Sequence, residues 1–163
     1  MRARWLTALA VAAMLAAAAC GTTPTTVTGT GVAAQPVAVR DGGFEFAVCH
    51  VVQVHQVGDP RNPGLSITAK GVFVVVALAI RNVGDGPLTF FDRYQTLIDS
   101  RGSQCSASMA ADIYGNLDIP STTIAPGDAL TVHLAFDVPV DTVPTNLTLR
   151  QSDTSAGATV ALS

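Results

Sequence analysis

The sequence has almost no lysine or glutamate, and only 13% of its residues are charged. Lys70 is the one lysine and Glu45 the one glutamate, so eight of the nine basic residues are arginine. No cluster of basic side chains is present that could neutralise a row of phosphates, which nucleic-acid binding requires first. The same scarcity excludes a polybasic segment or a basic amphipathic helix as a membrane contact. We therefore expect no nucleic-acid partner.

The longest uncharged apolar run lies at the N-terminus, over residues 5–19, and two arginines precede it. Its fifteen residues fall short of the roughly 20 that cross the hydrocarbon core as a helix. A basic start, an apolar segment and small residues before a cysteine predict an export signal over residues 1–19.

The residues before Cys20 resemble the lipobox of bacterial lipoproteins, in which the cysteine thiol takes a diacylglycerol before cleavage. Ala17 stands where leucine is usual. We expect Cys20 to be the lipidation site and the lipid, a palmitate-type acyl anchor, to provide the only membrane contact. The alternative is an ordinary secretory signal cut near Ala19, which would release the protein.

Residues 20–39 contain no charged side chain and few large apolar ones. Threonine, proline and glycine without periodicity cannot bury enough surface to offset the entropy of ordering, so this segment is expected to be a flexible tether. Residues 40–163 have the length of one domain. Without residues 1–19 the chain has seven basic and twelve acidic side chains, a formal net charge of −5.

Apolar residues in the domain recur at spacing two, which predicts strands. Residues 72–83 are nearly all apolar, as in a central strand buried on both faces, and a loop is expected over 57–64. In the strand over 44–54, one face is expected to hold Phe44, Phe46, Val48, His50, Val52 and Val54. Further predicted elements are strands over 88–91, 94–99, 103–108, 122–124, 129–138, 146–150 and 158–162, and one helical turn over 109–115.

Turn signals separate these strands every eight to twelve residues, and the clearest is Ala125-Pro126-Gly127-Asp128. Proline presets φ at the second position of a type II turn and glycine permits the positive φ of the third. About eight short strands divided in this way predict an all-β, antiparallel β-sandwich.

Residues 71–87, 97–102 and 124–128, with 136–139, carry a resemblance to a known family. They resemble an immunoglobulin-like extracellular domain of unknown function, which is common in lipoproteins and secreted proteins of Gram-positive bacteria and actinobacteria. That family is similar in fold to a small immunoprotective antigen secreted by mycobacteria. The resemblance covers about residues 44–162 and implies an immunoglobulin-like sandwich of about 7–9 strands. It supplies no active-site residues.

With Cys20 lipidated, Cys49 and Cys105 remain as one pair in an oxidising compartment, so a disulfide between them is expected. In the chain-entropy model, closing this loop stabilises the domain by roughly 4 kcal/mol. Because Cys49 falls on the more polar face of its strand, we expect the bridge near an edge or outer surface. The alternative is a reactive thiol at Cys105, but no basic neighbour is present to lower its pKa.

Histidines and aspartates give no strong site. His50 and His55 are five residues apart on one strand, so they point to opposite faces and are unsuited to zinc. His133 lacks the Gly-x-Ser-x-Gly elbow of a hydrolase and is expected on a polar strand face. Calcium is the better metal hypothesis, yet turn aspartates usually cap backbone amides. These are Asp85, Asp92, Asp99, Asp112, Asp118 and Asp128.

We therefore expect no cofactor, metal or catalytic residue. The sequence predicts a protein lipid-anchored to the outer face of the cytoplasmic membrane, whose domain contacts an envelope protein, a polymer or a host surface molecule. The alternative is an exported hydrolase or small-molecule carrier whose site is assembled from dispersed residues. A deep apolar pocket with convergent His, Ser or Asp side chains would favour that alternative.

Overall fold

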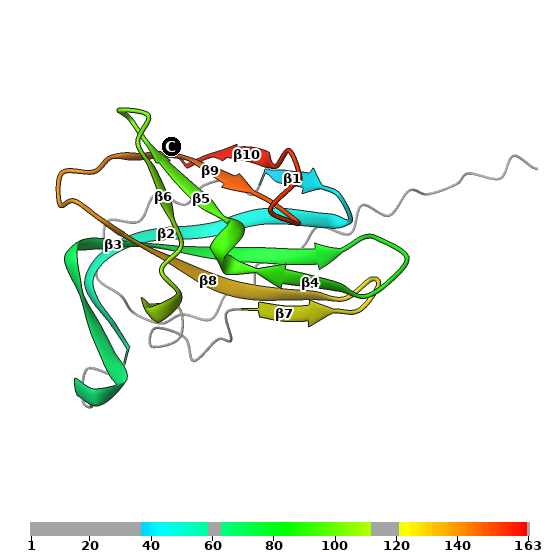
Figure 1. Ribbon diagram of the computed structural model, residues 1–163, viewed down its shortest axis with the longest axis horizontal. Coiled ribbons are helices and arrows are strands. Elements are labelled where there is room, and N and C mark those ends of the chain that lie inside the picture. The colour runs from blue at the N-terminus through cyan, green and yellow to red at the C-terminus, as the bar shows by residue number, and fades with distance from the viewer. Residues whose placement is uncertain (1–36, 59–62, 112–120, 163) are drawn as a thin grey trace, which may run out of the picture.

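The computed structural model describes residues 37–58, 63–111 and 121–162 (Figure 1). The predicted signal peptide and nearly all of the predicted tether, with Cys20, therefore lie outside the described residues. Most of the predicted helical turn over 109–115 lies outside them as well. Among the residues that are described, no helix has the length and apolar character needed to cross a membrane.

The described residues form ten strands and two short 3₁₀ helices, and residues 109–111 are helical as well. The elements are β1 (Ala38–Asp41), β2 (Phe44–Gly58), η1 (Pro63–Leu65), β3 (Ser66–Asn82), β4 (Leu88–Phe91), η2 (Asp92–Tyr94), β5 (Thr96–Asp99), β6 (Gln104–Ser106), β7 (Ser121–Ile124), β8 (Ala129–Val138), β9 (Pro144–Leu149) and β10 (Ala158–Ala161).

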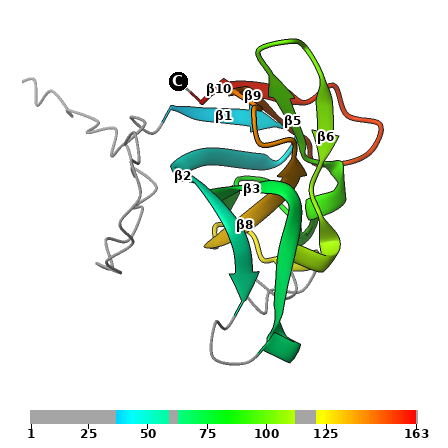
Figure 2. The ribbon, with the colours of Figure 1, turned by 90° about the vertical axis from the view of Figure 1, so that its left-hand side faces the viewer.

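Two four-stranded antiparallel sheets make the body of the domain. One sheet has the strand order β1-β2-β3-β8 and the other has β10-β9-β5-β6, while β4 and β7 form a separate pair. Figures 1 and 2 show the second sheet lying against one face of the first. The prediction of an all-β, antiparallel β-sandwich is confirmed.

Most predicted strands occur within a few residues of their expected bounds, and the predicted type II turn is present. The N–H of Asp128 donates to the carbonyl oxygen of Ala125 at 3.1 Å, and Gly127 has φ of 82°. β1 was not predicted, because Ala38 and Val39 were assigned to the tether. They are strand residues because they pair with Ala47 and Phe46 of β2.

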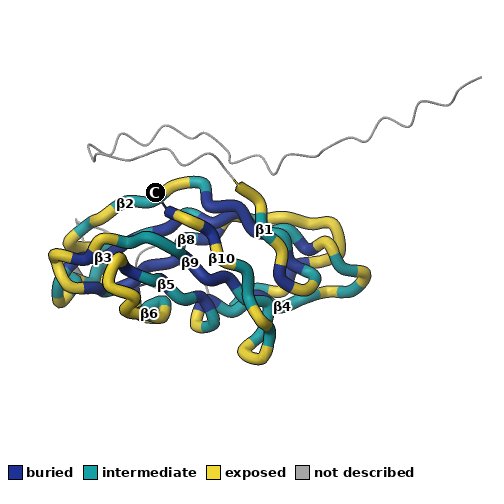
Figure 3. Tube along the Cα trace, turned by 90° about the horizontal axis from the view of Figure 1, so that it is seen from above, coloured by how far each residue is buried: buried dark blue, intermediate teal, exposed yellow. Residues whose placement is uncertain are grey.

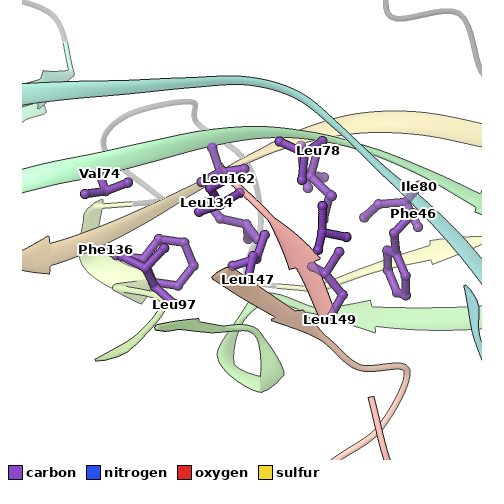
Figure 4. Packing of buried hydrophobic residues seen from close by; sticks show 14 of the residues in the cluster. Phe46, Val74, Leu78, Ile80, Leu97, Leu134, Phe136, Leu147, Leu149 and Leu162 are labelled. Atoms are coloured by element: carbon purple, nitrogen blue, oxygen red, sulfur yellow. The ribbon is translucent and has the colours of Figure 1, made fainter. Parts of the chain in front are cut away.

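The inner faces of the two sheets meet in one apolar core (Figure 4). Phe44, Phe46 and Phe90 pack together there, with ring centroids 5.7 to 6.3 Å apart. Figure 3 shows the buried stretches inside the body and the exposed ones mainly along turns and edges. The largest fully buried aliphatic side chains of this core include Leu78, Ile80, Leu97, Leu134, Leu147 and Leu149.

The regular alternation predicted for the first long strand is wrong beyond Val48. β2 contains two β-bulges, between Val48 and His50 and between Val54 and Gln56. A bulge inserts one extra residue, so the side chains after it exchange faces. Val51 therefore packs against the main core, and His50 is exposed.

β2 and β3 extend beyond the rest of their sheet as a two-stranded arm, because β8 pairs with β3 only from Val72 onward. The arm leaves the sandwich at the lower side of Figure 2. A second, smaller apolar cluster lies where it begins, around the buried side chains of Phe73, Ala111 and Ala135. Val54 and Ile67 of the arm pack against this cluster.

Candidate functional site

The two described cysteines lie in different sheets, Cys49 at the first bulge of β2 and Cys105 in β6. Cys105 has a free thiol, so the predicted disulfide between them is wrong. An even number of remaining cysteines does not fix which of them are close in space. Cys105 packs against the main core, with its Sγ 3.6 Å from the carbonyl oxygen of Asp137.

The three histidines are separated in the fold. His50 and His55 are both exposed on β2, and His133 is half-buried on β8, opposite Ala77 of β3. In the part of the chain that the structure describes, no three His, Cys, Asp or Glu side chains are grouped so that they could hold a metal ion. The described histidines therefore do not define a site.

Asp99 caps the β5–β6 turn, as expected of a turn aspartate. Its Oδ1 accepts hydrogen bonds from the backbone N–H of Arg101 and of Ser103, both at 2.8 Å. Asp85 and Asp128 are exposed, whereas Asp92 is buried. The remaining two calcium candidates, Asp112 and Asp118, lie outside the described residues.

Asp41 was not singled out in the sequence, yet it holds the β9–β10 loop against β1. Its carboxylate accepts hydrogen bonds from the backbone N–H of Gln151 at 2.7 Å and of Gly157 at 3.0 Å. Burial raises the pKa of Asp41, but these and other hydrogen bonds outweigh it and leave the pKa below the ordinary value. The pKa of Asp99 is also lowered, because its backbone hydrogen bonds outweigh the effect of burial.

We expect Asp41→Asn to lower the free energy of unfolding at neutral pH. We also expect the free energy of unfolding of this variant to fall less in acid than that of the wild type. A carboxyl whose pKa is lower in the folded chain stabilises it fully above the unfolded pKa and loses that contribution as pH falls through the folded pKa. The asparagine does not titrate, so this loss disappears. Urea unfolding at neutral pH and at about pH 3 measures both effects. Asp153→Asn, at an exposed position, is the control, and equal acid sensitivity of Asp41→Asn and wild type would contradict the assignment.

A cavity of about 210 Å³ lies between the β5–β6 hairpin and the turn that joins β8 to β9. Figure 1 shows both turns at the left-hand end of the sandwich. The residues that line the cavity are Leu97, Asp99, Ser103, Gln104 and Cys105 from the hairpin and Asp137, Val138, Pro139 and Thr142 from β8 and the following turn. Two of these residues are acidic, and none is lysine, arginine or histidine.

The two turns around the cavity are tied to each other. The N–H of Ser100 donates to the carbonyl oxygen of Val143 at 2.9 Å, and Arg101 forms an ion pair with Asp141 at 3.2 Å. Within the second turn, the N–H of Thr142 donates to the carbonyl oxygen of Pro139 at 3.0 Å. These contacts hold both walls of the cavity in place before any ligand arrives.

Three residues of the lining, Asp137, Cys105 and Thr142, have contacts that bear on the chemistry of the cavity. The carboxylate of Asp137 accepts hydrogen bonds from the backbone N–H of Lys70 and of Gly71, at 3.1 to 3.3 Å. Burial raises the pKa of the Cys105 thiol, and the negative charge of Asp137 raises this pKa further. The thiol therefore remains protonated at neutral pH and is a poor nucleophile. Thr142 is 6% exposed, and its Oγ1 has no hydrogen-bond partner among the residues that the structure describes.

Cys105 and Asp99 were candidate residues in the sequence, whereas Asp137 and Thr142 were not. Asp137 lies in a regular strand, and Thr142 lies in a turn that has no characteristic motif. The two become neighbours of the hairpin only through the packing of the second sheet on the first. The carboxylates of both acidic residues are already engaged, since Asp99 lies 3.6 Å from the Arg101 guanidinium and Asp137 accepts hydrogen bonds from the β3 backbone.

Comparison with known proteins places most of the chain in one family. Residues 37–160 match the model of a domain of unknown function, DUF4352. No curated protein matches the sequence. The predicted membership in a family with a domain of unknown function is thereby confirmed.

Solved structures share the fold at low sequence identity. A conserved hypothetical protein from Bacillus anthracis is 12% identical, with a TM-score of 0.60 over 85% of this chain and 100% of that one. A putative lipoprotein (ycdA) from Bacillus subtilis is 15% identical, with a TM-score of 0.50 over 79% of this chain and 39% of that one.

A further similar structure is the secreted protein MPT63 from Mycobacterium tuberculosis. It is 17% identical, with a TM-score of 0.47 over 71% of this chain and 83% of that one. Identities this low concern the fold alone, whereas the family match covers nearly all of the described domain. The chain therefore belongs to the DUF4352 family of domains of unknown function.

Proposed function

We propose that this protein is lipid-anchored to the cell envelope and that its β-sandwich is a noncatalytic binding or scaffolding domain. Support for the location comes from the N-terminal sequence, where an apolar segment and small residues lead to Cys20. The similarity in fold to a putative lipoprotein and to a secreted protein agrees with this location.

The cavity beside Cys105 is the observation that carries the noncatalytic role. Its volume of about 210 Å³ is smaller than the roughly 300–1,000 Å³ of most small-molecule sites. A nucleophile needs an adjacent base to be activated, and the described residues that line this cavity include no histidine or lysine. The raised pKa of the Cys105 thiol also opposes nucleophilic chemistry. These properties favour binding over hydrolysis.

The location is tested by Cys20→Ser in a bacterial host that lipidates its own lipoproteins. The wild-type chain is expected in the membrane fraction and to be released by detergent, because acyl chains hold it there. Cys20→Ser has no thiol to acylate and is expected to lose at least about nine-tenths of its membrane association.

Cys105→Ser is the control, because it changes a domain cysteine and leaves the signal intact. It is expected to stay in the membrane fraction. Equal membrane association of Cys20→Ser and wild type would contradict the lipid anchor. Release of the wild-type chain into the medium would instead support the plain secretory signal.

A further inference from the structure

An arginine and two aromatic side chains gather at η2, the short helix between β4 and β5 (Figure 1). Arg93 is exposed, and its guanidinium carbon lies 4.4 Å from the centre of the Phe91 ring and 4.7 Å from that of Tyr94. Its Nη2 also donates to the Tyr94 hydroxyl oxygen at 2.9 Å. Both rings are half-buried, with centroids 5.3 Å apart. We call these three residues the η2 cluster.

The Arg93 guanidinium has hydrogen-bond donors left for a ligand. An arginine side chain has five N–H groups, and the Tyr94 hydroxyl accepts from one of them. In the described part of the chain, no carboxylate lies within ion-pair distance of Arg93, whereas Arg40 and Arg101 are both paired with acidic side chains. The exposed edge of the Arg93 guanidinium is therefore open to an acceptor from outside.

Buried groups fix the backbone that carries the η2 cluster. Asp92 is 5% exposed, and its Oδ1 accepts from the backbone N–H of Arg93 at 2.6 Å. Gln95 is completely buried, and its side-chain amide donates to the carbonyl oxygens of Phe91 at 2.8 Å and Arg150 at 3.0 Å. Stacking on the two rings also restricts the guanidinium itself. A ligand therefore meets a positioned cation, which reduces the entropy lost on binding.

The chemistry of the η2 cluster favours a single carboxylate as its ligand. The planar fork of a guanidinium matches a carboxylate in a bidentate pair. A row of phosphates requires several cations, whereas Arg93 follows an aspartate in a chain that is net negative beyond residue 19. Arginine and tyrosine are also enriched among the residues that dominate protein interfaces. The cluster therefore suits an acidic side chain better than a polyanion.

We propose that the η2 cluster binds an aspartate or glutamate side chain of a partner protein. Arg93 pairs with the carboxylate, and the rings of Phe91 and Tyr94 contact the residues beside it. The proposal rests on the proposed function as a binding domain and specifies the chemistry of its partner. A partner protein is favoured over a free carboxylic acid because a small acid on this open surface would bury little area.

The test uses the mature chain, residues 20–163, and the peptides acetyl-Leu-Glu-Leu-amide and acetyl-Leu-Gln-Leu-amide. Glutamine keeps the length of the glutamate side chain and removes its charge. The glutamate peptide is expected to bind at least about fivefold more tightly. In NMR titrations it is expected to shift the Nε–H signal of Arg93 and the backbone amide signal of Tyr94. Equal affinity of the two peptides would overturn the proposal.

Arg93→Gln is expected to reduce the preference for the glutamate peptide to less than about twofold, because the cation is lost. Arg93 is exposed, so this variant is expected to fold, and its amide spectrum checks this. Arg40→Gln is the matched control, since Arg40 is an exposed arginine that is already paired with Glu45 at 2.7 Å. The control is expected to keep the full preference. A full preference in folded Arg93→Gln would overturn the proposal.

Two further ligands separate the sources of the negative charge. Sodium acetate is expected to bind at least about tenfold more weakly than the glutamate peptide, and equal affinity would overturn the partner-protein part. Acetyl-Leu-phosphoserine-Leu-amide is expected to bind no more than about threefold more tightly than the glutamate peptide. A larger gain would overturn the choice of a carboxylate. Cleavage of any peptide, detected by mass spectrometry, would instead contradict the noncatalytic function.

Discussion

Phe46→Ala is expected to lower the free energy of unfolding by about 3–5 kcal/mol. The Phe46 ring is completely buried between the sheets, where it packs against Phe44 and Phe90. Its removal exposes a cavity that the surrounding strands cannot fill, because β2 is hydrogen-bonded on both sides at this residue. Urea unfolding followed by circular dichroism measures the loss. For a domain of ordinary stability, this is a large part of the total.

Phe91→Ala is the matched control for this prediction. The same atoms are removed there from a half-exposed ring at the end of β4, which contacts Tyr94 and Arg93 near the surface. Its expected cost is about 1 kcal/mol. Similar losses in both variants would show that the main core does not lie where the structure places it.

Asn82→Leu is expected to cost about 2–5 kcal/mol, although leucine has the same number and branching of side-chain heavy atoms as asparagine. The buried Asn82 amide donates to the carbonyl oxygens of Gly86 and Ile124, both at 2.8 Å, and its oxygen accepts from the N–H of Gly84 at 2.9 Å. Leucine leaves these three backbone groups without that partner. Thermal and urea unfolding give the size of the loss.

Asn146→Ala provides the comparison for a weaker amide contact. Asn146 is half-buried, and its amide donates to the Thr145 hydroxyl at 3.2 Å. A loss of about 1 kcal/mol or less is expected, because water can replace this bond. If Asn82→Leu is as stable as Asn146→Ala, the amide of Asn82 does not organise the turns at this end of the sandwich.

Local patterns in the sequence predicted the fold class. Apolar alternation and Pro-Gly turn chemistry are encoded by neighbouring residues, so β8 and the turn from Ala125 to Asp128 occur as predicted. The bulge at Cys49 has no comparable local signal, because it depends on how β2 pairs with β3. Gln95 was missed for a similar reason. Its side chain is fully buried, and its amide forms two hydrogen bonds with the backbone of Arg150, which is 55 residues away.

The candidate site was less predictable than the fold. Asp99 could be assigned a capping role because the backbone N–H groups that it binds belong to residues only two and four positions further along the chain. Asp137 and Thr142 join it through the contact between two sheets, which no spacing in the sequence records. The cysteine pairing failed in the same way, since the number of cysteines limits the pairings without choosing among them.

Mass spectrometry of the N-terminal peptide, from protein purified out of its native host, tests the proposed envelope anchor most directly. We predict a mature chain that begins at Cys20 with a diacylglycerol in thioether linkage to its sulfur. A chain that retains Met1 would contradict this account. So would a lipid-free Cys20 in a disulfide, because a sulfur that carries the thioether cannot also form that bond.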